Sequence, residues 1–104
     1  MVEIPLHWEL NDFPYFAFNY GPAFPAGQGR IANYSQVLNT WKEEFRAFYK
    51  YGLCYVTQFD PQTIGTPGRI ALLENLLAFI RTYDNVWFAT GREVAEHWRN
   101  QKGL

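Results

Sequence analysis

From residue 34 onward the chain alternates between stretches with helical spacing and short apolar runs, and this alternation restricts the possible folds most strongly. Apolar residues recur every three or four positions after Ser35, after Thr66 and after Thr90, which predicts three helices. Between these stretches lie residues 53–59 and 86–89, which are apolar and aromatic as in strands covered on both faces. Strands that alternate with helices predict a mainly parallel sheet.

The residues at the ends of these stretches support the three predicted helices. We expect Ser35 to cap the first helix and Gly52 to end it. Thr66 and Pro67 form a typical helix start, and Thr90 and Glu93 have the spacing of a capping box. The second helix is expected to turn an apolar stripe toward the core, namely Ile70, Leu73, Leu77 and Ile80, widened by Leu72, Leu76 and Phe79.

The N-terminal third has a different character. Residues 2–10 alternate enough to predict a short strand, with Pro5 marking an edge or an irregular start. Residues 11–33 contain three prolines and three glycines and are predicted to form a long loop. The expected fold is therefore a single α/β domain over residues 1–104, in two or three layers, with the order β-loop-α-β-α-β-α. Its three strands would leave both edges of the sheet open.

Charge and cysteine content exclude several classes of protein. Nine Lys and Arg residues balance ten Asp and Glu residues, giving a net charge of -1, so we expect no nucleic-acid or anionic-membrane partner. The N-terminus lacks the basic start and apolar stretch of a signal peptide, and no window approaches the roughly 20 apolar residues of a membrane span. We therefore expect a cytoplasmic protein. Cys54, the only cysteine, is expected to be buried and cannot form an internal disulfide.

Aromatic residues are concentrated in the predicted loop. A core of this size cannot easily enclose them all, so some are expected to contact a ligand or a second subunit. Asp12 and Glu9 flank this loop and are either solvated turn carboxylates or contacts to a polar ligand. The aromatic residues concerned are Phe13, Tyr15, Phe16, Phe18, Tyr20 and Phe24.

Several longer segments resemble one known family. The segments are PQTIGTPGRIALLE at 61–74, VWFAT at 86–90 and EHW at 96–98, together with EIP at 3–5 and LNDFPYF at 10–16. In this order they resemble the C-terminal third of polysaccharide deacetylases, in the branch that includes allantoinase-like and peptidoglycan-deacetylase-like proteins. The resemblance implies part of a distorted (β/α) barrel, since a closed barrel of this kind needs about 200 residues or more.

The same resemblance implies that the chemistry of these enzymes is missing here. In the family an Asp and two His hold a divalent metal, a second Asp is the base, and a late His is the general acid. The metal ligands and the base lie in an N-terminal half that has no counterpart in this sequence, and Asp60 stands at the position of the late His. A carboxyl group has an ordinary pKa of about 4 and is ionised at neutral pH. Alternatively, Asp60 simply forms a turn before Pro61.

The sequence therefore predicts no catalytic residue, metal or cofactor. His7 and His97 lack the close spacing of a metal site and are expected to be ordinary surface or satisfied histidines. We expect a non-catalytic, self-associating protein, with a homodimer favoured because a two-fold interface reuses one patch. A module that binds a sugar or heterocycle through the aromatic loop remains an alternative, as does one half of a split deacetylase.

Overall fold

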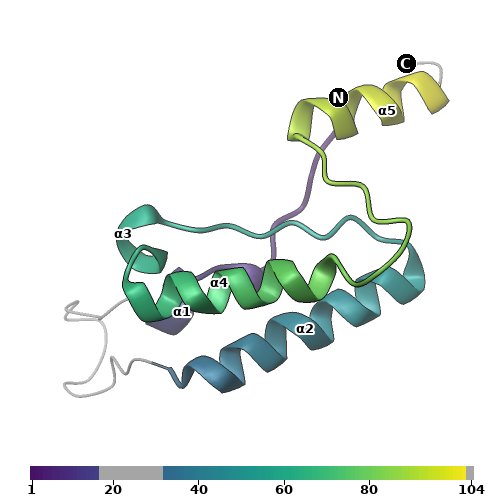
Figure 1. Cartoon of the computed structure of the whole chain (residues 1–104). Coiled ribbons are helices and arrows are strands. Elements are labelled where there is room, and N and C mark those ends of the chain that lie inside the picture. The colour runs from purple at the N-terminus through teal and green to yellow at the C-terminus, as the bar shows by residue number, and fades with distance from the viewer. Residues whose placement is uncertain (17–31, 103–104) are drawn as a thin grey trace.

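The structure, a computed structural model, describes residues 1–16 and 32–102 and is helical where it is regular (Figure 1). Two short helices near the N-terminus precede a long helix, and another short helix precedes the last two. The helices in chain order are η1 (Trp8–Leu10), α1 (Phe13–Phe16), α2 (Tyr34–Tyr51), α3 (Pro61–Ile64), α4 (Pro67–Ile80) and α5 (Gly91–Lys102).

The prediction of an α/β fold with a mainly parallel sheet is wrong for the part of the chain that the structure describes. Residues 53–59 run back across the molecule to α3, and residues 86–89 lead to α5, both as open segments and not as paired strands (Figure 1). The one β-type pairing here is a parallel bridge between Asn11 and Gln58. A strand exists only where a neighbouring backbone supplies its hydrogen bonds, and these segments have such a neighbour at a single point.

The N-terminal predictions are corrected as well. Residues 2–7 form no strand and lead into η1, so the predicted strand over residues 2–10 is wrong. The predicted loop over residues 11–33 begins with α1, and residues 17–31 of it lie outside the described residues.

The three predicted helices are confirmed as α2, α4 and α5. Asn33, not Ser35, caps α2, because its side-chain oxygen accepts a hydrogen bond from the Gln36 N–H at 3.2 Å. Gly52 ends the helix as predicted, in the left-handed conformation with φ 67°. The capping box is also confirmed, since Thr90 and Glu93 exchange hydrogen bonds of 2.9 and 3.2 Å. The bond from the Thr90 N–H lowers the pKa of the Glu93 carboxyl group.

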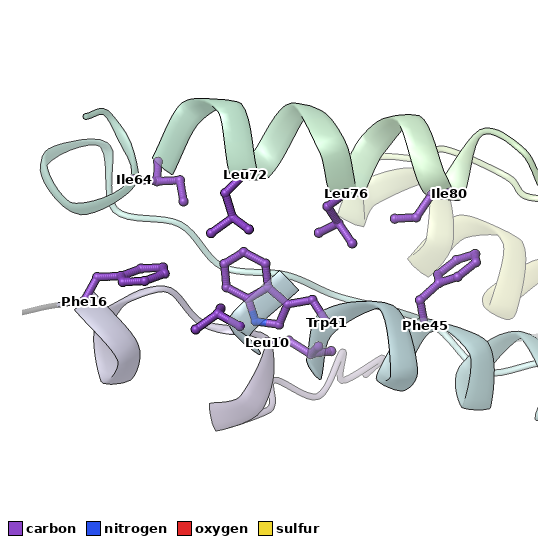
Figure 2. Packing of buried hydrophobic residues seen from close by; sticks show 9 residues of the cluster. Leu10, Phe16, Trp41, Phe45, Ile64, Leu72, Leu76 and Ile80 are labelled. Carbon is purple, nitrogen blue, oxygen red and sulfur yellow. The ribbon is translucent and has the colours of Figure 1, made fainter. Parts of the chain in front are cut away.

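The core lies between α2 and α4, with η1, α1 and α3 closing one end (Figures 1 and 2). Trp41 on α2 is fully buried at its centre, and its indole N–H donates to the Glu9 carbonyl at 2.8 Å. The buried apolar residues are Leu10, Phe16, Val37, Trp41, Phe45, Ile64, Leu72, Leu76 and Ile80.

The face of α4 differs from the predicted one. Leu72, Leu76 and Ile80 point into the core (Figure 2), whereas Ile70 and Leu77 are exposed. An α4 that is apolar on most sides has no single stripe that spacing alone can identify. Its inward side is set by the rows of side chains that meet α2.

The open segments and α5 leave several large apolar side chains exposed. Leu53, Trp87 and Phe88 are 59%, 56% and 61% exposed. Cys54 is exposed too, so its predicted burial is wrong. The prediction assumed a strand covered on both faces, and no described strand lies beside Cys54. Helix α5 stands apart from the α2–α4 pair (Figure 1), and none of its residues 91–101 is buried.

Candidate functional site

Asp12 and Asp60 are brought together by the parallel bridge. The Gln58 N–H donates to the Leu10 carbonyl at 3.0 Å, and the Asp12 N–H donates to the Gln58 carbonyl at 3.2 Å. This register places the Asp12 carboxylate beside the next turn, where its Oδ2 accepts a hydrogen bond of 2.9 Å from the Asp60 N–H. Two carboxyl side chains 48 positions apart in sequence thus share one site.

The Asp12 side chain is the buried member of the pair. It is 0% exposed, and its Oδ1 has no hydrogen-bond partner among the described residues. Burial raises the pKa of the Asp12 carboxyl group above its usual value, because the charged form loses hydration. The hydrogen bond from the Asp60 N–H opposes this pKa shift, while the nearby Asp60 carboxylate adds to it.

The Asp60 side chain is exposed and caps α3. Its Oδ1 accepts a hydrogen bond of 2.9 Å from the Gln62 N–H, and Pro61 occupies the first helical position. This is the turn that the Asp-Pro sequence predicted as the alternative to a catalytic position. Its carboxylate therefore has a structural role at the start of a helix.

A shallow depression lies next to this pair. Phe13, which is 56% exposed, stands beside the amide side chains of Asn11 and Gln58, whose Nδ2 and Oε1 are 3.5 Å apart. The residues that line the depression are Asn11, Phe13, Gln58, Phe59, Asp60 and Pro61.

The other aromatic candidates are placed differently. Phe16 is buried in the core, with its ring edge-on to those of Trp41 and Tyr34. Tyr15 is half-buried, and its hydroxyl donates to the Glu9 carbonyl at 3.1 Å. Both side chains are thus used in packing. Phe18, Tyr20 and Phe24 lie outside the described residues.

Arg69, in the first turn of the helix predicted to begin at Thr66 and Pro67, is a buried polar residue. Its guanidinium donates to the Thr63 carbonyl at 2.9 Å and to the Phe16 carbonyl at 3.5 Å, and it lies 4.9 Å from the Phe16 ring centre. It thereby joins α1, α3 and α4. A cation in the first turn of an apolar helix opposes the helix dipole, and this was the available signal for a tertiary partner.

The remaining candidates do not gather at one place. His7 packs edge-on against Phe48, and His97 lies against Trp87 at the other end of the chain. Within residues 1–16 and 32–102, no three His, Cys, Asp or Glu side chains come close enough to hold a metal ion. In the same residues no helix has the length and apolar character to cross a membrane.

The fold is that of part of a polysaccharide deacetylase, which confirms the resemblance predicted from the sequence. The chain is similar to the crystal structure of a Mycobacterium smegmatis protein assigned as a polysaccharide deacetylase, with a TM-score of 0.79 and 33% sequence identity. The match covers 94% of this chain and 33% of that protein, so the chain spans about a third of the length of its relative. No family model and no curated protein sequence matches the chain.

Proposed function

We propose that the chain is a non-catalytic, self-associating protein built on part of the polysaccharide-deacetylase fold. The observation that carries this proposal is the position of Asp60. The resemblance puts the family's proton-donating His at this position, and here the side chain caps α3 through Gln62. General acids for amide hydrolysis work best with a pKa near the operating pH, whereas carboxyl groups ordinarily titrate near pH 4.

Acetate release from N-acetylated oligosaccharides in the presence of Zn²⁺ tests the absence of catalysis. We expect neither the wild-type protein nor Asp60→His to release acetate above a protein-free control, because the variant restores one residue type and no metal site. Release of acetate by the wild type that disappears in Asp60→Ala would contradict the proposal. Asp60→Asn keeps a capping oxygen and serves as the matched control for the fold.

The exposed apolar side chains support self-association. Leu53, Trp87 and Phe88 lie on segments that few described residues cover, and a net charge of -1 offers little electrostatic resistance to pairing. We place the protein in the cytoplasm, where an exposed free thiol such as Cys54 stays reduced.

The depression beside Asp60 favours a second candidate function, the binding of a saccharide. An exposed aromatic ring next to two amide side chains can stack on a sugar ring and satisfy its hydroxyl groups. Thermal unfolding with N-acetylglucosamine oligomers tests this candidate, since a ligand of the folded state raises the melting temperature. A rise that Phe13→Ala abolishes would support it, and no rise at millimolar sugar would exclude it.

A further inference from the structure

The segments between the described helices leave large apolar side chains exposed. Leu53, Trp87 and Phe88 are 59%, 56% and 61% exposed. Exposed apolar side chains on neighbouring segments are the kind of surface that a protein–protein interface buries.

Part of the open segment 53–59 has unpaired backbone groups. Between Cys54 and Thr57, no N–H or C=O group makes a backbone hydrogen bond to another described residue. The segment is bounded by such bonds on both sides, from the Leu53 N–H to Phe48 and from the Gln58 N–H to Leu10. A row of unpaired donors and acceptors between two fixed ends is a template for strand addition.

The composition of this segment suits a strand and lacks the usual protection of a free edge. Residues 53–57 read LCYVT, with aromatic and β-branched side chains and with no charged residue, proline or glycine. Natural edge strands are commonly blocked by charges or proline. The N-terminal segment has such a block in Pro5, and residues 53–57 have none.

Tyr55 holds the segment in place. Its hydroxyl donates to the Trp41 carbonyl at 3.0 Å, and its ring packs edge-on against Phe45 and Phe48 on α2. Residues 86–89 are equally apolar, but only Val86 among them packs against the core. A segment that is fixed beforehand loses less entropy on pairing, which favours residues 53–57 over residues 86–89.

We infer that two copies of the chain pair through residues 53–57, as antiparallel strands related by a two-fold axis near Tyr55. This inference rests on the proposed self-association and names its interface. A two-fold axis uses the same uncharged patch twice and satisfies the open backbone groups of both copies. It places the two exposed Cys54 residues at diagonal positions, with their Cα atoms about 8 Å apart.

The single cysteine makes this arrangement directly testable. A bis-maleimide reagent with a short spacer should join two wild-type chains through Cys54 into a covalent dimer. The control is Cys54→Ser carrying Ser35→Cys, which moves the thiol to an exposed site at the opposite end of α2 and should give no covalent dimer. Cross-linking at residue 35 equal to that at residue 54, or none at residue 54 in a protein of dimeric mass, would overturn the interface and leave self-association intact.

A charge at the edge gives an independent readout. Leu53→Lys alters an exposed side chain and should weaken dimerisation about tenfold or more by light scattering, because a charge on an otherwise uncharged edge opposes strand pairing. Leu77→Lys makes the same change on the exposed side of α4 and should leave the dimer unchanged. Equal effects of the two variants would count against pairing at residues 53–57, while a monomeric wild type would overturn both the interface and self-association.

Discussion

The buried carboxylate of Asp12 accepts a 2.9 Å hydrogen bond from the backbone N–H of Asp60 and so fixes the entry to α3. The contact joins the N-terminal segment to the point where the open segment 53–59 ends. The resemblance puts Asp60 at the position of the family's catalytic His, and the backbone N–H of Asp60 is bonded to this buried acceptor. Both residues contribute to the fold at a place where the resemblance implies chemistry.

Removing the Asp12 acceptor should destabilise the protein. Asp12→Ala leaves the partly buried Asp60 N–H without its partner, and we expect a loss of about 1–3 kcal/mol in the free energy of unfolding. Asp12→Asn retains an acceptor oxygen and should lose less. Urea unfolding measures both variants, and an Asp12→Ala protein as stable as the wild type would show that this hydrogen bond contributes nothing.

The raised pKa of Asp12 predicts a specific pH dependence. A carboxyl group with a folded-state pKa above its unfolded value of about 3.8 favours the folded state most when protonated. Its contribution is complete below that value and falls as the pH rises through the folded-state pKa. The wild type should therefore lose stability relative to Asp12→Asn as the pH rises from about 4 toward neutrality. Urea midpoints of both proteins across this range test the sign, and a gap that stays constant would refute it.

The free energy of unfolding should be sensitive even to a conservative change at Arg69. Lys presents a single ammonium group and cannot reproduce the fork that reaches the carbonyls of Thr63 and Phe16. We expect Arg69→Lys to reduce the free energy of unfolding by about 1–3 kcal/mol. Arg81→Lys, at the exposed C-cap of α4, is the matched control and should change it by less than about 0.5 kcal/mol. Equal stability of the two variants would show that the hydrogen bonds of Arg69 do not stabilise the fold.

Substitutions at two tryptophans should distinguish a core position from an exposed one. Trp41→Phe deletes the N–H that bonds to Glu9 and opens a cavity in the core, which should cost about 2–4 kcal/mol. Trp87→Phe alters a side chain that is more than half exposed and should leave the free energy of unfolding nearly unchanged. Chemical denaturation compares the two, and an equal loss in both would place Trp87 inside the folded core.

The helices were predictable because their signals are local. Gly52 ends α2, and Thr90 with Glu93 begins α5, through residues that lie within one turn of each other. The open segments were not predictable in the same way. Residues 53–59 and 86–89 have strand composition, but a strand also needs a neighbour, and composition cannot supply one. The burial of Cys54 was wrongly predicted for the same reason, because it assumed neighbouring strands that the described residues do not supply.

The candidate site was predictable only in part. The Asp60-Pro61 pair predicted a turn, and the turn is present. The contact between Asp12 and Asp60 depends on the register of Asn11 against Gln58, which no local pattern encodes. The face of α4 was missed because Ile70 and Leu77 are as apolar as Leu72 and Leu76.

We propose that a second copy of the chain covers the apolar side chains that the described residues leave exposed. The most direct measurement is molar mass in solution, by light scattering on a size-exclusion column over a wide range of protein concentration. We predict a mass of about twice 12.2 kDa that Leu53→Lys shifts toward the monomer. A mass of 12.2 kDa at every concentration would contradict self-association and the interface at residues 53–57 together.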